Sequence, residues 1–171
     1  MMQSRAMREK SEMEKKNQAV IERIESAEEK RIIARKVLES LHDWFEVDAS
    51  REKYIEESAD QIFIAASSGD DHIGFLCLKQ TGRETVELAV MGVIREYHRS
   101  GIGRCLFEKA REIAKEEGYL FMQVKTVQMG VYKDYDITNR FYRACGFKEF
   151  EVIREIWGEA NPCQIYVMYL A

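Results

Sequence analysis

The chain has little proline and no long apolar run. Its 171 residues include one proline and no low-complexity tract, so we expect no linker and no internal repeat. No apolar stretch approaches the roughly 18 residues of a membrane-spanning helix, and the amino terminus lacks the apolar core of a signal peptide. These absences predict a single domain over residues 19–171 that is cytoplasmic and has no membrane partner.

Cysteines are few and scattered. The four cysteines form no C-x-x-C pair, which argues against a zinc site or a disulfide framework. Each lies in an apolar setting within or beside an expected strand or helix, so buried free thiols and no metal are predicted. They are Cys77, Cys105, Cys145 and Cys163.

A strong positive charge is also missing. The formal net charge is −4, which argues against nucleic acid as a partner and is consistent with a cationic amine. Residues 1–18 are polar and show little apolar periodicity, so we expect a frayed or solvated helical extension there.

Residues 86–118 predict a buried strand, a loop and an amphipathic helix in succession. The strand runs from Val86 to about Val93, and the loop over residues 95–103 is rich in glycine and arginine. Gly118 is suited to end the helix in a left-handed conformation. The helix has apolar residues at three- and four-residue steps: Ile102, Cys105, Leu106, Ala110, Ile113 and Ala114.

The way this loop enters the helix is typical of an anion site, with a tight turn as the alternative. Gly101 and Gly103 remove side chains where the amides of the first turn point outward and the helix dipole is positive. Arg99 and Arg104 lie on either side. A Rossmann fingerprint would need a small residue at Leu106, and a P-loop would need GK[ST]. A diphosphate ligand of another kind is therefore expected.

The first half of the chain predicts two helices and a hairpin. Residues 20–24 fit a strand or an extension of a preceding helix. Ser26 and Glu29 form a capping box for a helix reaching about Leu41. The apolar face of that helix is Ile32, Ile33, Val37 and Leu41.

A second helix over residues 51–58 follows the aromatic pair Trp44 and Phe45, and either Asp48 or Ser50 would cap it. Next come strands at residues 62–68 and 72–80, joined by a Gly-Asp-Asp turn.

The second half predicts strands and one short helix. A strand at 119–127 must cross over the preceding helix to run parallel to the strand at 86–93. Residues 128–137 are expected to be a polar loop, and Thr138 or Asp136 would cap a helix over 139–145 that ends at Gly146. Strands at 147–153 and 163–170 close the sheet as a hairpin.

Two motifs resemble the GNAT superfamily of N-acetyltransferases. The run VIREYHRSGIGRCLFEKA is similar to that family's acetyl-CoA motif, with His98 where the family has Arg or Gln and Arg99 able to substitute for it. The run TNRFYRACGF, residues 138–147, is similar to its Asn- and Tyr-bearing helix. The resemblance covers residues 60–170 and implies an α+β fold. The implied fold has a mixed, twisted sheet of six to seven strands and about four helices.

The resemblance also implies how acetyl-CoA would bind as co-substrate. The pantetheine arm would lie between the strands at 86–93 and 119–127, and backbone amides of Met91, Gly92 and Val93 would bind the acetyl oxygen. For Gly92 the alternative is a close strand contact. Asn139 would bind pantetheine amides or cap its own helix. The residues implied for the diphosphate are His98, Arg99, Ser100, Gly101, Ile102, Gly103 and Arg104.

Two side chains are candidates for proton transfer. Tyr142 would be the general acid, because a phenol with a pKa near 10 stays protonated at neutral pH; a packed core tyrosine is the alternative. Glu87 would be the general base, or would pair with a Lys or Arg on a neighbouring strand. Asp134, Asp136 and His98 are other candidates for the base.

The function predicted is acetyl transfer from acetyl-CoA to a primary amine of a small molecule or peptide in a ternary complex. A non-catalytic acyl-CoA-binding regulator is the alternative from another class. A longer acyl group is a third hypothesis, with Met91, Met122 and Phe141 lining its pocket. The Trp157 loop and the last strand would form the edge of a homodimer, unless that edge is covered.

Overall fold

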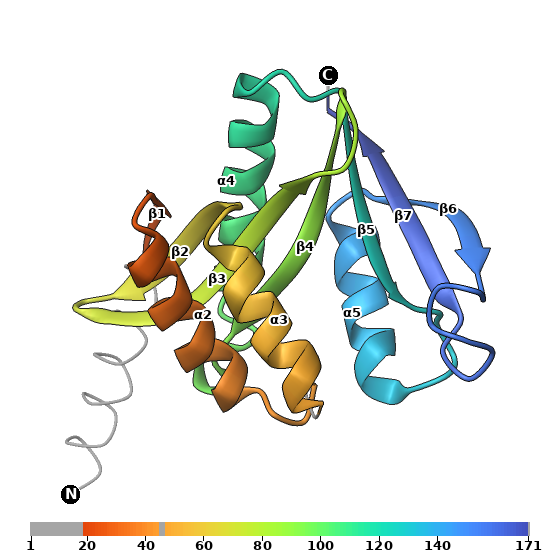
Figure 1. Ribbon diagram of the computed structural model, residues 1–171, viewed down its shortest axis with the longest axis horizontal. Helices are drawn as coiled ribbons and strands as arrows, with labels where there is room; N and C mark the ends of the chain where they lie inside the picture. Colours follow the sequence, from red (N-terminus) through yellow and green to blue (C-terminus); the bar gives the residue numbers. More distant parts are fainter. Residues whose placement is uncertain (1–18, 45–46, 171) are drawn as a thin grey trace, which may run out of the picture. The chain divides into compact units, whose positions relative to one another are not determined.

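The structure is a computed structural model that describes residues 19–44 and 47–170. Phe45 and the predicted helical extension over residues 1–18 lie outside them. The elements are β1 (Val20–Ile24), α2 (Ala27–Ser40), α3 (Asp48–Ser58), β2 (Ile62–Ser68), β3 (Asp71–Gln80), β4 (Thr85–Val93), a short 3-10 helix (Arg95–Tyr97), α4 (Ile102–Glu116), β5 (Phe121–Val127), α5 (Lys133–Ala144), β6 (Lys148–Ile153) and β7 (Cys163–Tyr169) (Figure 1). The predicted α+β class is confirmed.

The strands join into one mixed sheet in the order β1-β2-β3-β4-β5-β7-β6. The predicted crossover is confirmed, because β4 and β5 pair in parallel. Their register runs from Thr85–Phe121 to Leu88–Val124, so both strands continue past the last paired residues. On its other side β5 pairs antiparallel with β7, which in turn pairs antiparallel with β6.

The chain divides into two compact units. One contains the chain up to Leu76 and Met91–Leu106, and the other contains Cys77–Val90 and the chain from Phe107 onward. β3, β4 and α4 each pass from one unit into the other.

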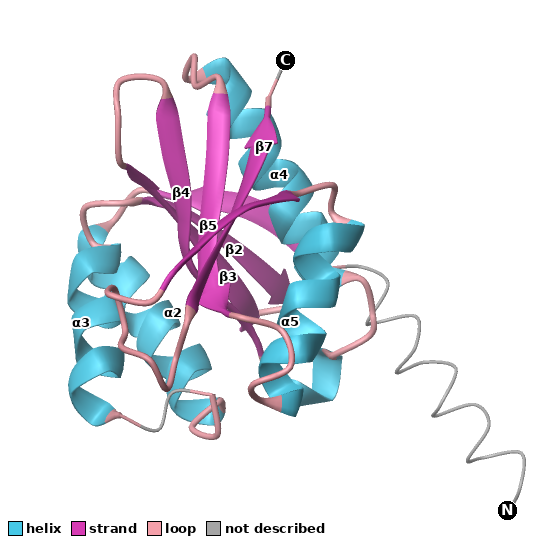
Figure 2. Ribbon diagram, turned by 90° about the vertical axis from the view of Figure 1, so that its right-hand side faces the viewer, coloured by secondary structure: helices cyan, strands magenta, loops and turns pink. Residues whose placement is uncertain are grey.

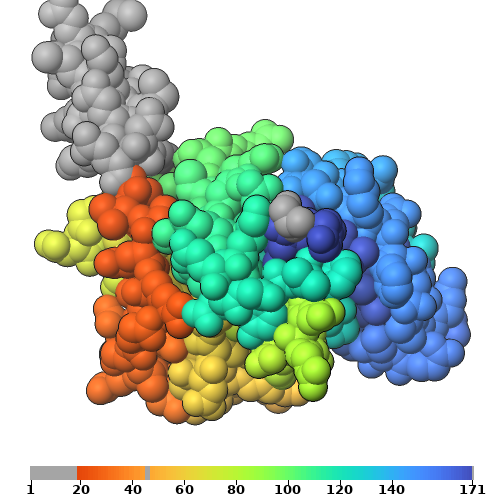
Figure 3. Space-filling view, turned by 90° about the horizontal axis from the view of Figure 1, so that it is seen from above, coloured from red at the N-terminus to blue at the C-terminus, as the bar shows by residue number. Residues whose placement is uncertain are grey.

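In the first unit, α2 and α3 lie side by side (Figure 1). Ser26 caps α2 as predicted, accepting a hydrogen bond from Glu29 N at 3.3 Å. One member of the predicted apolar face is wrong, since Ile32 is 61 % exposed while Ile33 and Val37 are buried. The buried stripe follows the 3.6-residue period through Ile33 and Val37, and Ile32 falls beside it. The turn between β2 and β3 projects from the surface of this unit (Figure 3).

In the second unit, α5 packs along β5 and β7 (Figure 2). Gly118 ends α4 as predicted, at φ +86°, with Tyr119 N donating to Ala114 O. Gly146 ends α5 in the same way at φ +101°. These backbone bonds satisfy carbonyl groups that a helix end would otherwise leave unpaired.

The sequence placed the starts of α3 and α5 too late along the chain. The residue before α3 is Val47, and Asp48 and Ser50 lie inside its first turns, where Asp48 accepts a hydrogen bond from Arg51. The residue before α5 is Tyr132, so the end of the predicted polar loop is helical. Acidic residues in the first turn of a helix stabilise it, because they interact with the positive end of the helix dipole. Asp48 and Asp136 were expected to be caps, whereas both lie inside these first turns.

Two further expectations are corrected. Cys105 is exposed, because it lies beside the buried stripe of α4, whereas the other three cysteines are buried; none of the four forms a disulfide. The last strand is not an edge, because β7 lies between β5 and β6. The edge strand on this side of the sheet is β6. Its Phe150 lies in a bulge and is 66 % exposed.

Candidate functional site

The junction of β4 and α4 has the geometry of an anion site. Arg99 at φ +60° and Gly101 at φ +86° turn the chain into α4. Cys105 N donates to Gly101 O at 3.0 Å, and the amides of residues 102–104 precede that bond at the positive end of the helix dipole. Arg99 and Arg104 are exposed there. An anion would therefore meet backbone donors and positive charge together.

The arginine and histidine before the turn are engaged elsewhere. Arg95 pairs with Asp43, and its guanidinium carbon lies 5.2 Å from the ring centroid of Trp44. His98 Nε2 donates to Val93 O at 2.6 Å, since a carbonyl can only accept. The His98 ring also meets Trp44 edge-on, with centroids 5.9 Å apart. These contacts tie the loop to the end of β4 and to the turn that follows α2.

Gly92 is required by packing in the first unit. A Cβ at this position would lie 2.9 Å from Val37 Cγ1 and 3.0 Å from Leu41 Cδ1, so α2 approaches β4 too closely for any side chain. The alternative expected from the sequence was a close contact between strands, whereas the side chains that crowd Gly92 come from α2 and the residue that follows it. Gly74, which the sequence analysis missed, has a similar reason, because its Cβ would lie 2.9 Å from Gly92 O. A single glycine within an apolar strand gave no signal for that contact.

Tyr142 is placed in the second unit by α5, which turns the side chain inward. The residue is buried, and its ring centroid lies 5.9 Å from that of Phe147 and 6.3 Å from that of Tyr166. These contacts fix the plane of the phenol. The packed tyrosine expected as the alternative is thus observed, and a role in proton transfer is compatible with it.

Asn139 ties three elements of the second unit together. Its Nδ2 donates to Val127 O at 2.9 Å and to Tyr135 O at 2.7 Å, and its Oδ1 accepts from Tyr166 Oη at 2.7 Å. Burial raises the pKa of Tyr166, which keeps this donor protonated. Asn139 does not cap α5, because it lies in the interior of the helix.

Glu87 forms an ion pair across the parallel strands. Its Oε2 lies 2.7 Å from Lys125 Nζ, and the two side chains are 15 % and 28 % exposed. The register places Glu87 beside Gln123, whereas Leu88 aligns with Val124 and Tyr166. Because successive strand residues face opposite sides, Glu87 lies on the face away from Tyr166 and its neighbour Tyr142.

Two other candidates for the base, Asp134 and Asp136, lie in the first turn of α5. Asp136 accepts from Gly130 N at 2.7 Å, which holds the turn before α5. Asp134 is an exposed residue of the first turn of α5.

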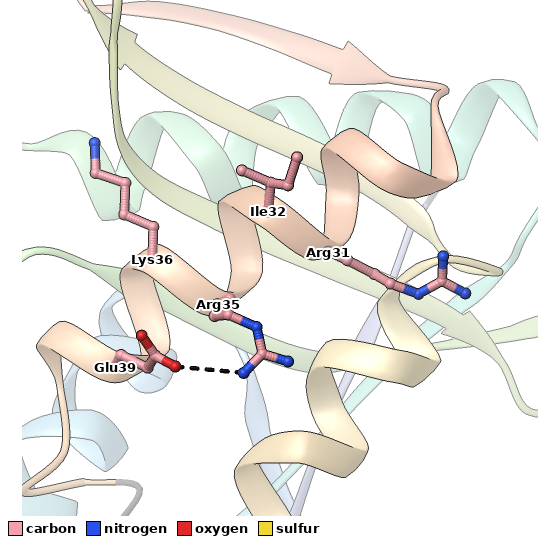
Figure 4. Close-up of a pocket in the computed structure, with 5 residues that line it drawn as sticks. All are labelled: Arg31, Ile32, Arg35, Lys36 and Glu39. Carbon is pink, nitrogen blue, oxygen red and sulfur yellow. Dashed lines mark hydrogen bonds and ion pairs between the residues drawn. The ribbon is translucent and has the colours of Figure 1, made fainter.

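An open hollow of about 560 Å³ lies along the exposed side of α2 (Figure 4). Its cations are matched by carboxylates: Arg31 by Glu56, Arg35 by Glu52 and Glu39, and Lys36 by Asp71. Arg35 also holds the pKa of Glu52 below its ordinary value through their hydrogen bonds. This hollow therefore offers no unmatched charge to a ligand.

Two general features of the described residues bear on the kind of site. Across residues 19–44 and 47–170, no three His, Cys, Asp or Glu side chains are grouped so as to hold a metal ion. None of the helices described is both long and apolar enough to cross a membrane.

Comparison with known proteins gives consistent matches. The sequence model of the acetyltransferase (GNAT) family matches residues 22–147. An uncharacterised N-acetyltransferase of Chlorobaculum tepidum is 29 % identical over 117 residues, which are 67 % of this chain and 68 % of that protein.

Two solved structures share the fold. A GNAT-family acetyltransferase of Desulfovibrio desulfuricans has a TM-score of 0.76 at 21 % identity, covering 90 % of this chain and 99 % of that one. An acetyltransferase of Salmonella typhimurium, solved with its cofactor acetyl-CoA, has a TM-score of 0.65 at 15 % identity, covering 90 % and 94 %. The predicted fold is confirmed by these likenesses.

Proposed function

Since the chain belongs to the GNAT family of acetyltransferases, we propose that it transfers an acetyl group from acetyl-CoA to a primary amine by direct attack in a ternary complex. The observation that carries this proposal is the start of α4. A left-handed turn at Arg99 and Gly101 there presents helix amides beside exposed arginines, as a diphosphate requires.

The residues at this junction fit the diphosphate of acetyl-CoA. The amides of Ile102, Gly103 and Arg104 would donate to it, and Arg99 would add charge. Ser100 contributes through the shape of the turn, since its hydroxyl bonds Tyr97 O. His98 would act indirectly through its bond to Val93 O. When bound, acetyl-CoA supplies the thioester that is broken in the transfer.

The carboxyl-terminal end of β4 is the proposed site for the acetyl group. Amides of Met91, Gly92 and Val93 would polarise the acetyl carbonyl, which is the largest single contribution expected in acyl transfer. The parallel register of β4 with β5 ends at Leu88, before these residues. The contacts of Gly92 with α2 would keep this backbone rigid.

Tyr142 and Glu87 are the proposed acid and base. The Tyr142 phenol would donate a proton to the departing thiolate, and Asn139 would hold α5 against β5 and β7. Glu87 would take the proton of the attacking amine, through water where direct contact is not reached. The amine bonds to the acetyl carbon as the thiolate leaves it, so the base and the acid would act on different groups.

The acceptor class follows from the amine chemistry and the charge of the chain. A net charge of −4 favours a cationic small molecule or peptide amine over nucleic acid. The acceptor and the acyl chain length are proposed only at this level. A regulator that binds acyl-CoA without turnover is the alternative, and it would need neither Tyr142 nor Glu87.

The test is calorimetric titration with acetyl-CoA, CoA and NADH. Micromolar binding of both CoA species and none of NADH is expected. In Gly103→Glu the added carboxylate should weaken CoA binding by at least about tenfold, while Gln80→Glu adds the same charge at the exposed end of β3 and should not. Thiol release with a panel of amines then separates the enzyme from the regulator. Equal CoA affinity in Gly103→Glu would refute the diphosphate site.

A further inference from the structure

Trp44 is a partly buried side chain of the turn that follows α2, and the proposed reaction assigns it no role. The guanidinium carbon of Arg95 lies 5.2 Å from the centroid of its ring. The ring of His98 meets it edge-on, with centroids 5.9 Å apart. A cation near an indole face and an edge-on ring pair are both attractive contacts. Trp44 therefore holds two side chains of the loop between β4 and α4.

These two side chains lie at the two ends of the short 3-10 helix, Arg95–Tyr97. Arg95 is its first residue, and His98 directly follows it, with His98 N donating to Arg95 O at 3.0 Å. Asp43, next to Trp44 in the same turn, pairs with Arg95. The turn after α2 therefore fixes the short helix at its start and at its end. All of these residues belong to the first unit.

The residue that follows His98 has an unusual backbone conformation. Arg99 has φ +60° and is the one non-glycine residue with a positive φ among residues 19–44 and 47–170. Residues with a side chain rarely adopt this region, and they remain there only when the surrounding structure holds them. The contacts of His98 with Val93 O and with Trp44 supply such a hold directly before Arg99.

We propose that Trp44 is a positioning residue for acetyl-CoA, an inference that rests on the function proposed above. By holding Arg95 and His98 it keeps Arg99 in the left-handed turn that points the first amides of α4 at the diphosphate. Trp44 itself need not touch the cofactor, because its effect passes through the shape of the loop. Without the ring the loop samples other conformations, and the apparent CoA affinity falls in proportion to the fraction of molecules that keep the turn.

The first experiment titrates CoA into the wild type, Trp44→Leu and Trp44→Phe. Trp44→Leu should weaken CoA binding by about five- to tenfold, which is the order of the two lost contacts taken together. Trp44→Phe keeps an aromatic ring at the same place, so its loss should be smaller. Trp157→Leu is the matched control and should bind CoA like the wild type, since Trp157 lies in the loop between β6 and β7 and is 42 % exposed.

The second experiment separates a positioning role from general packing by combining Trp44→Leu with Arg99→Gly. Arg99→Gly alone should weaken CoA binding, because it removes a positive charge from the anion site. Glycine adopts a positive φ without strain, so the turn in this background no longer depends on Trp44. Adding Trp44→Leu to Arg99→Gly should therefore cost less than about twofold in CoA affinity, against about five- to tenfold in the wild type. If urea unfolding shows that Trp44→Leu is not folded, the same cycle is measured with Trp44→Phe.

Three results would contradict this assignment. One is a CoA affinity of Trp44→Leu within about twofold of the wild type. Another is an equal loss in both backgrounds, which would mean that Trp44 acts through packing and not through the turn at Arg99. The third is an equal loss for Trp44→Phe and Trp44→Leu, since the aromatic ring would then contribute nothing. Failure of the wild type to bind CoA would instead refute the proposed function itself.

Discussion

Lys125 Nζ lies 2.7 Å from Glu87 Oε2 and so links β5 to β4, although Lys125 itself follows the last register pair, Leu88–Val124. Both side chains are partly buried, and the opposite face of the two strands carries apolar residues. An ion pair of this kind can have a purely structural role, or it can position a carboxylate that accepts a proton in the reaction. Removing the charge of Glu87 or of Lys125 by substitution distinguishes these two roles.

Glu87→Gln should lower kcat/KM by about a hundredfold, because the proposed base is lost. Lys125→Met removes the same ion pair but keeps the carboxylate, so it should retain most of the wild-type kcat/KM. The measurement is kcat/KM of both variants with the same amine. Equal kcat/KM for Glu87→Gln and the wild type would reduce Glu87 to a structural residue.

Tyr142→Phe should lower kcat by about a hundredfold with CoA affinity unchanged. The ring contacts with Phe147 and Tyr166 are kept, so only the proton donor is removed. Steady-state kinetics and CoA titration provide both numbers. Tyr132→Phe, at the exposed start of α5, is the matched control and should behave as the wild type. Full kcat in Tyr142→Phe would exclude it as the general acid.

The order and class of the elements could be predicted from local patterns. The capping box at Ser26, the left-handed glycines at 118 and 146, and the apolar stripe of α4 each depend on neighbours in the sequence. The same reasoning failed at α3 and α5, because Asp48 and Asp136 suit a cap and a first turn equally well. Local chemistry did not distinguish those two positions.

Contacts between residues far apart in the sequence could not be predicted from local patterns. That Val37 presses on Gly92 depends on how α2 crosses β4, and that Tyr166 binds Asn139 depends on β7 lying between β5 and β6. Alternation along β4 did identify Glu87 as facing away from Val86 and Leu88. Its partner Lys125 could be named by type but not by position, because the register of β5 was unknown.

Tyr166→Phe should destabilise the fold by about 1–3 kcal/mol, because it leaves the buried Asn139 Oδ1 without its donor. Urea unfolding at neutral pH measures this loss. Tyr169→Phe, in the same strand but exposed, is the control and should change stability little. Equal midpoints for the two variants would mean that Asn139 finds another donor.

Gly92→Ala should destabilise the fold by about 1–3 kcal/mol through overpacking against α2. The added methyl group would lie 2.9 Å from Val37 Cγ1, which is closer than such atoms can approach. Adding Val37→Ala should recover part of the loss, so the double variant should be more stable than the sum of the single effects predicts. Strict additivity in urea unfolding would contradict this contact.

In Cys163→Ala the free energy of unfolding should fall less steeply as the pH rises through the alkaline range. Burial raises the pKa of the Cys163 thiol, so the folded state disfavours the thiolate. The unfolded chain ionises the thiol near pH 8.5. The contribution to stability is therefore complete below that pH and is lost as pH rises toward the higher folded pKa, by up to about 1.4 kcal/mol per pH unit.

The measurement is the unfolding free energy of wild type, Cys163→Ala and Cys105→Ala between pH 7 and 10. The wild type and Cys105→Ala should lose stability together above pH 8.5, since Cys105 is exposed. Cys163→Ala starts lower because of the cavity it leaves, but its slope should be smaller. The buried Tyr166, whose pKa is also raised, adds a loss that begins only near pH 10. A slope in Cys163→Ala as steep as the wild type's would mean that the thiol ionises as readily in the folded state as in the unfolded chain.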